Sequence, residues 1–215
     1  MAASLNNDLQ APAYWQEACE FLIQQGPVWA RLVRQYPDRA LRSRGAPYET
    51  LLRSLVGQQI SVKAAQAVWD RVVNALGGEI DSNVLLSLDD QVLRETGLSR
   101  QKVVYAKALS DFDQQRQLKQ DVLVGLDDEA CLKHLCQVKG IGPWTAQMFL
   151  MFCLRRPDVW PVDDIGVQNG ISRQFFADQP IGPKEALQFG EKLKPWRTVA
   201  AWYLWRSLDP AVVDY

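Results

Sequence analysis

Nearly every apolar stretch of this 215-residue chain has the spacing of a helix, and this pattern restricts the fold more than any other feature. Apolar side chains recur three and four residues apart, as in Leu51, Leu52, Leu55 and Val56. That period is typical of a helix with one buried face. No stretch alternates apolar and polar residues as a half-buried strand does. The sequence therefore predicts an all-α fold of about ten helices.

Residues with local capping preferences mark the expected helix ends. A serine hydroxyl can accept a hydrogen bond from an amide in the first turn, which stabilises the start of a helix. Three serines stand before apolar-periodic segments: Ser61, Ser87 and Ser99. Pro12 is expected to open the first helix and Gly26 to end it.

The charge balance gives no sign of a nucleic-acid partner. Lysine and arginine number 24 against 25 aspartate and glutamate residues, for a formal net charge of -1. A chain that binds nucleic acid through charge usually has a basic excess. Any DNA binding must therefore come from a local basic patch, from backbone amides or from side chains inserted into the duplex.

The cysteines and the single histidine do not form a metal-binding pattern. Cys19, Cys131, Cys136 and Cys153 are scattered and form no Cys-x-x-Cys pair, and His134 stands alone. Structural zinc sites need closely spaced ligands. Buried free thiols are the simpler interpretation, and we expect no metal and no cofactor.

The chain also lacks the patterns of membrane and secreted proteins. No apolar run approaches the roughly 20 residues of a membrane-spanning helix. The first ten residues, MAASLNNDLQ, do not follow the charged-then-apolar pattern of a secretory signal. We expect no membrane partner, and a location in the cytoplasm (nucleoid) of a bacterium or in the nucleus of a eukaryote.

The segment Val138-Lys139-Gly140-Ile141-Gly142-Pro143-Trp144-Thr145-Ala146 is the most informative in the chain. Two glycines two residues apart allow a very tight turn between helices. Pro143 suits the first turn of the second helix, where its missing N–H costs nothing. The amides at that helix start can bind an anion such as a DNA phosphate. On spacing alone, a plain helix–helix turn is equally consistent.

This segment resembles the hairpin of the helix-hairpin-helix DNA glycosylase superfamily. In that superfamily a loop containing Gly or Pro follows and ends at a catalytic aspartate, as residues 159–164 do here. The segment 57–61 resembles the family's wedge loop, whose tip fills the gap left by a flipped base. Residues 194–197 with Trp205 resemble the final helix of the 3-methyladenine DNA glycosylase II branch, in its compact form. The resemblance covers about residues 14–208.

The resemblance implies a two-lobed helical bundle with the active site in the cleft between the lobes. Lobe A would comprise residues 46–163, and lobe B residues 1–45 plus 164–215, with hinges near 42–47 and 155–163. Asp164 would be the catalytic residue. The base would bind at Trp144, Trp205 and Met148. The expected DNA-contacting residues are Gln58, Gln59, Ser61, Lys139, Gly140, Gly142 and Thr145.

Two departures from related branches narrow the expected activity. Relatives that also cut the DNA strand carry a lysine at the position of Trp144, so no amine nucleophile is expected here. Relatives with an iron–sulfur cluster carry four closely spaced C-terminal cysteines, whereas no cysteine follows Cys153. The expected protein is a monomeric, monofunctional DNA glycosylase of base excision repair that acts on double-stranded DNA containing alkylated bases. It would flip alkylated purines of the 3-methyladenine or 7-methylguanine type out of the duplex and hydrolyse their N-glycosidic bond.

Three alternatives remain at this point. Asp163 precedes Asp164, and since adjacent side chains point in different directions, only one can serve catalysis; the other could cap the helix that begins at Ile165. A glycosylase for etheno, deaminated or oxidised bases is the second alternative. A non-catalytic protein that binds damaged DNA is the third.

Overall fold

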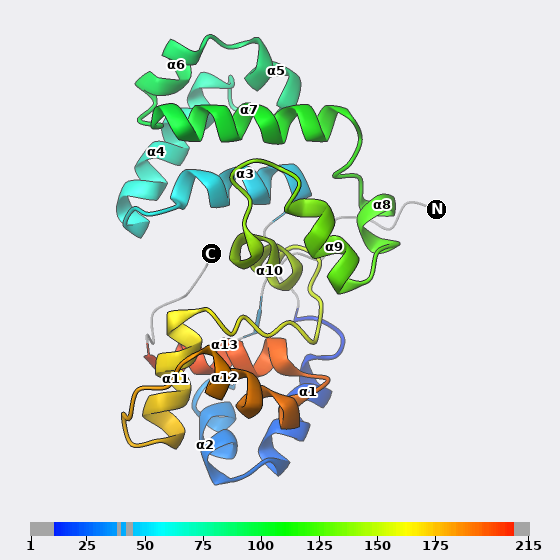
Figure 1. The fold of residues 1–215 in the computed structure, drawn as a ribbon, viewed down its shortest axis with the longest axis vertical. Coiled ribbons are helices and arrows are strands. Elements are labelled where there is room, and N and C mark those ends of the chain that lie inside the picture. Colours follow the sequence, from blue (N-terminus) through cyan, green and yellow to red (C-terminus); the bar gives the residue numbers. More distant parts are fainter. Residues whose placement is uncertain (1–10, 38–39, 42–44, 209–215) are drawn as a thin grey trace. The chain divides into compact units, whose positions relative to one another are not determined.

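The computed structural model describes residues 11–37, 40–41 and 45–208, and the regular structure of these residues is entirely helical (Figure 1). The predicted all-α fold is therefore confirmed. Contacts between residues divide the chain into two compact units. Unit 1 contains the described residues of 1–44 and 150–215, and unit 2 contains residues 45–149.

Unit 2 is organised around α7, its longest helix. Helix α7 packs against α3 and α5, and α3 also packs against α4; α3 and α7 lie side by side in Figure 1. The periodic leucines of α3 face this packing and are buried, as the sequence predicts. The helices of this unit are α3 (Pro47–Gly57), α4 (Val62–Ala75), α5 (Ser82–Ser87), α6 (Asp90–Glu95), α7 (Arg100–Gln114), α8 (Gln120–Val124) and α9 (Asp128–Leu135).

Unit 1 is built around α13, which packs against α11, α1 and α2. Every residue of α13 from Thr198 to Arg206 is buried. A helix that is surrounded by protein on all sides shows no apolar stripe, because no face of it meets water. The helices are α1 (Trp15–Gln24), α2 (Pro27–Gln35), α11 (Ile165–Phe175), α12 (Pro183–Gly190), the short 3-10 helix η1 (Glu191–Leu193) and α13 (Arg197–Leu208). Helix α10 (Pro143–Phe152) runs from unit 2 into unit 1.

Two of the three predicted serine caps are confirmed. The Ala64 amide donates to the Ser61 hydroxyl at 3.3 Å, and the Lys102 amide donates to that of Ser99 at 3.2 Å. The prediction for Ser87 is wrong. Ser87 ends α5 and donates its hydroxyl to the carbonyl of Val84 at 2.7 Å, one turn earlier.

The first helix also starts later than predicted. It begins at Trp15, and the Trp15 amide donates to the carbonyl of Pro12 at 2.9 Å in a preceding turn. The predicted hinge near 42–47 falls partly on residues 42–44, which lie outside the described residues. Within the described part of the chain, no helix has the length and apolar character required to cross a bilayer.

The loop after α10 belongs to unit 1. The sequence places the junction between lobes after residue 163. Grouping residues by their contacts instead places the boundary between the two units inside α10, between residues 149 and 150. Long-range hydrogen bonds hold this loop in unit 1. The Val159 amide donates to the Thr198 hydroxyl at 2.9 Å, and the Trp160 indole donates to the carbonyl of Ala186 at 2.8 Å.

Candidate functional site

Asp164 is the N-cap residue of α11. Its backbone is extended, with φ of -76° and ψ of 117°, and its Oδ1 accepts the Val167 amide at 2.8 Å. A carboxylate in this position accepts a hydrogen bond from a first-turn amide that has no partner within the helix. Its negative charge also interacts favourably with the positive end of the helix dipole. Of the two aspartates that could cap α11, Asp164 is therefore the one that does. Asp163 is exposed, whereas Asp164 is 8% exposed.

A second donor reaches the same oxygen of Asp164. The indole N–H of Trp205, on α13, donates to Oδ1 at 2.8 Å. The Trp205 ring is 4% exposed and stacks on Phe152, with ring centroids 6.0 Å apart and an interplanar angle of 22°. The sequence does not anticipate this contact. The base-binding role expected for Trp205 stays a prediction, made for a side chain that is buried here.

Gly166 provides the space for this arrangement. A Cβ added at Gly166 would lie 2.8 Å from Cδ1 of Trp205 and 3.0 Å from Oδ1 of Asp164. Ordinary Cβ contacts are longer than 3.4 Å. Any side chain at this position would therefore displace the indole, the carboxylate or both.

The loop that leads to Asp164 is fixed to α13 by an ion pair. The Arg197 guanidinium binds Asp158 in a bidentate manner, with Nε–Oδ1 at 2.6 Å and Nη2–Oδ2 at 2.9 Å. Bidentate pairs of this kind are among the stronger hydrogen-bonded contacts. The Thr198 hydroxyl donates to the carbonyl of Arg156 at 2.7 Å. The loop is thus held along its length, which fixes the point at which α11 starts.

The predicted hairpin lies in unit 2, between α9 and α10. Gly140 has a φ of +97°, a conformation that favours glycine. An added Cβ at Gly140 would overlap the ring of Tyr105, on α7. The Ile141 amide closes the turn by donating to the carbonyl of Val138 at 3.0 Å. Pro143 begins α10, as predicted.

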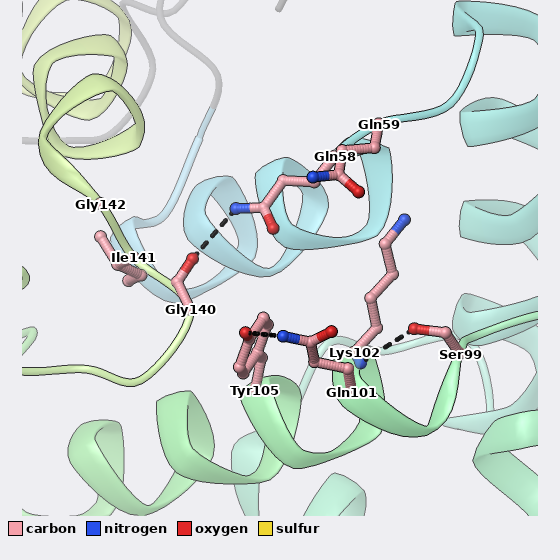
Figure 2. A pocket seen from close by; sticks show the side chains of 9 residues that line it. All are labelled: Gln58, Gln59, Ser99, Gln101, Lys102, Tyr105, Gly140, Ile141 and Gly142. Carbon is pink, nitrogen blue, oxygen red and sulfur yellow. Dashed lines mark hydrogen bonds between the residues drawn. The ribbon is translucent and has the colours of Figure 1, made fainter.

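A pocket of about 390 Å³ lies beside this hairpin (Figure 2). It is bounded by the hairpin, the loop after α3 and the first turns of α7. Polar side chains make up most of its wall, and among them the Gln58 amide donates to the carbonyl of Gly140 at 3.0 Å. The lining residues are Gln58, Gln59, Ser99, Gln101, Lys102, Tyr105, Gly140, Ile141 and Gly142.

Two side chains of α7 that line this pocket form hydrogen bonds with neighbouring groups. The Lys102 ammonium donates to the carbonyl of Val56, in the last turn of α3, at 2.7 Å. Partial burial lowers the pKa of Lys102. The Gln101 amide donates to the hydroxyl of Tyr105, as Figure 2 shows. The sequence shows that Gln101 and Tyr105 lie one helical turn apart after the Ser99 cap. It gives no sign that they lie beside the hairpin.

The loop between α3 and α4 contains a strained residue. Gln59 is exposed and has a φ of +58°. This left-handed conformation is unfavourable for a side chain with a Cβ. Strain of this type concentrates at functional sites, where the surrounding structure maintains it. The structure thus exposes the Gln59 side chain, and its wedge role stays a prediction.

The structure brings some predicted site residues together and separates others. Gln58, Gln59, Gly140 and Gly142 line one pocket, and Asp164 and Trp205 are hydrogen-bonded. Trp144 is 37% exposed in the first turn of α10, while Met148 is buried one turn later. The remaining three DNA-contacting candidates differ in exposure: Ser61 and Lys139 are exposed, and Thr145 is buried. Their functional roles stay predictions.

Comparison with known proteins identifies close relatives. A family model described as "HhH-GPD superfamily base excision DNA repair protein" matches residues 52–195. DNA-3-methyladenine glycosylase 1 of Schizosaccharomyces pombe is 32% identical over 188 residues, which is 83% of this chain and 81% of that protein.

Two solved structures are also similar. A crystal structure of DNA-3-methyladenine glycosidase from Bacillus halodurans is 30% identical and has a TM-score of 0.81, covering 89% of both chains. The 3-methyladenine DNA glycosylase of Schizosaccharomyces pombe in complex with abasic DNA is 30% identical and has a TM-score of 0.79. That match covers 93% of this chain and 98% of the other.

Proposed function

Because the chain belongs to the HhH-GPD superfamily of base excision DNA repair proteins, we propose that it is a monofunctional DNA glycosylase. It hydrolyses the N-glycosidic bond of alkylated purines in duplex DNA, as the 3-methyladenine glycosylases among its relatives are named for doing. The observation that carries the proposal is Asp164, a buried carboxylate fixed at the start of α11 by two N–H donors.

The chemistry of alkylated purines suits a single carboxylate. Alkylation at N3 or N7 places positive charge on the base, which weakens the glycosidic bond and makes the base a good leaving group. As the bond breaks, positive charge develops on the sugar around C1′. The Asp164 carboxylate stabilises this charge and orients or deprotonates the attacking water. No separate general acid is required for a leaving group that is already cationic.

Trp144 serves this reaction in two ways. Its exposed indole can stack on a cationic base, and a good cation–π contact contributes about 0.5–2 kcal/mol. It also occupies the position at which strand-cutting relatives carry a lysine. Without that amine no Schiff base forms with the sugar, and the enzyme leaves an abasic site in an intact strand.

The residues that line the pocket of unit 2, which together we call the pocket surface, supply the DNA contacts. The hairpin amides at Gly140 and Gly142 bind a phosphate without needing a cluster of lysines. Flipping a base out of the duplex costs a few kcal/mol of unstacking, and a side chain must fill the gap. Gln59 fills it, since its side chain stands exposed at the tip of its loop.

Base release from defined lesions tests this function. Duplexes with a single 7-methylguanine, ethenoadenine, hypoxanthine or 8-oxoguanine, and methylated genomic DNA, are incubated with the protein, and the released bases are identified. We expect release of methylated purines, and strand breaks only after alkali. Release confined to another lesion would overturn the substrate class. Retention of DNA without release would indicate a non-catalytic binder, and a borohydride-trapped adduct would contradict the monofunctional assignment.

A further inference from the structure

The hydrogen bond from Trp205 to Asp164 has a consequence for catalysis. Two donors to this side chain, the Val167 amide and the Trp205 indole, meet at Oδ1, each at 2.8 Å. A capping carboxylate with one donor can still rotate about its terminal torsion, which is broad for aspartate. A second donor from a different helix restricts that rotation, because the oxygen must satisfy both directions at once.

The indole itself is held in place from several sides. It stacks on Phe152, it is 4% exposed, and it approaches the backbone of α11 at Gly166 so closely that no Cβ fits there. Helix α13, which carries it, is buried throughout this stretch. A side chain confined in this way has a fixed N–H direction, which is what a positioning donor needs.

We propose that Trp205 is a positioning residue that orients the Asp164 carboxylate through its indole N–H, and that Gly166 preserves this contact. The inference rests on the proposed function, since it assigns Trp205 a role in that reaction. It differs from a base-stacking role, because Trp205 acts through Asp164 and its buried ring offers little surface to a base. Pre-organised donors and charges are effective in catalysis because they need no rearrangement during the reaction.

Trp205→Phe separates the two roles. Phenylalanine keeps an aromatic ring but has no N–H, so a stacking role would be largely retained and a positioning role lost. We expect the single-turnover rate of base release to fall about tenfold or more. The affinity for a duplex with a stable abasic-site analogue should change by less than about twofold, because the indole N–H acts on the carboxylate and not on the DNA.

The split between rate and affinity provides a readout that a purely structural role would not give. A loss of packing would lower the melting temperature and both quantities together, whereas the loss of a positioning donor lowers the rate at saturating protein and keeps the affinity for the abasic-site duplex. A wild-type rate in Trp205→Phe would overturn the proposal.

Gly166→Ala tests the same contact without changing the indole. Its Cβ would press on Trp205 and Asp164, so we expect a similar loss of rate. Gly78→Ala is the control, because Gly78 is exposed, has a φ of +96° and has nothing within 4 Å of an added Cβ, so the change strains the backbone without touching Asp164 or Trp205. We expect Gly78→Ala to lower the melting temperature but to keep the rate at a temperature where it is folded.

Combining the substitutions completes the test. If Gly166→Ala acts by displacing the indole, its effect should largely disappear in the Trp205→Phe background, since coupled residues are non-additive. Fully additive losses would overturn the link between Gly166 and Trp205. If Asp164→Asn is inactive while Trp205→Phe has a wild-type rate, only this inference fails. If Asp164→Asn is fully active, the catalytic assignment of Asp164 in the proposed function fails, and this inference fails with it.

Discussion

The surroundings of Asp164 in unit 1 and the pocket surface of unit 2 show opposite physical designs. Asp164 is 8% exposed, and its oxygen is fixed by an amide and by an indole that is itself buried. The pocket surface is lined by glutamine, serine, lysine and tyrosine side chains, and Gln59 at its edge is exposed and strained. We propose that this difference reflects a division of labour: unit 1 supplies a pre-organised carboxylate for the chemistry, and unit 2 supplies adaptable contacts to DNA.

The largest effect is expected at the carboxylate. Asp164→Asn keeps the size of the side chain and can still cap α11, but it removes the negative charge to which we assign the stabilisation of C1′. We expect base release in single turnovers to fall by about 100-fold or more, with little change in affinity for lesion DNA. Asp163→Asn is the control, because Asp163 is adjacent and exposed. Loss of activity in Asp163→Asn but not in Asp164→Asn would move the catalytic assignment by one residue.

The hairpin glycines are expected to produce the next largest effect, on binding. Gly140→Ala would place a Cβ in the Tyr105 ring and a side chain at a φ of +97°, so both stability and DNA affinity should fall, the affinity by about tenfold or 1.4 kcal/mol. Gly142→Ala has nothing within 4 Å of the added Cβ and should fold normally. If the hairpin approaches a phosphate closely, Gly142→Ala should still bind DNA more weakly. Wild-type affinity in both variants would remove the hairpin from the DNA contact.

Gln59 should show a trade-off between stability and binding. Gln59→Gly relieves the left-handed strain, which costs roughly 1–2 kcal/mol for a residue with a Cβ, so its melting temperature should rise. Without the side chain, affinity for lesion duplex should fall several-fold more than affinity for undamaged duplex. Fluorescence anisotropy on both duplexes measures the two affinities. Equal losses on the two duplexes would exclude a wedge role.

The smallest effect is expected at the helix caps. Ser99→Ala removes the hydroxyl that accepts the Lys102 amide, and loss of a capping hydroxyl costs about 1 kcal/mol. Chemical denaturation should detect this loss. Base release should be unchanged as long as the protein remains folded. A large loss of activity would show that Ser99 acts at the pocket surface beyond its structural role.

The sequence predicts the helical fold and the hairpin well, because both depend on local rules. The apolar period of α3, the Ser61 and Ser99 caps and the glycine at positive φ are each determined by residues a few positions apart. The Trp205–Asp164 contact could not be predicted in the same way, because it joins residues 41 positions apart. The same holds for the packing of Gly140 on Tyr105.

Capping at Asp164 and Ser87 could not be predicted for a related reason. At Asp163 and Asp164 two equally good capping residues stand side by side, and the path of the preceding loop decides between them. That loop is fixed by the contact of Asp158 with Arg197, 39 residues away. Ser87 stands at a position where it can bond backward as well as forward, and the end of α5 decides the outcome.

The division of labour between Asp164 and the pocket surface is tested most directly by comparing two variants on one lesion duplex. Single-turnover rates and dissociation constants are measured for Asp164→Asn and Gln59→Ala under the same conditions. We predict that Asp164→Asn loses the rate and keeps the affinity, and that Gln59→Ala loses affinity and keeps the rate at saturating protein. If Asp164→Asn lost affinity and kept its rate, or if both variants lost both quantities equally, the division of labour would be contradicted.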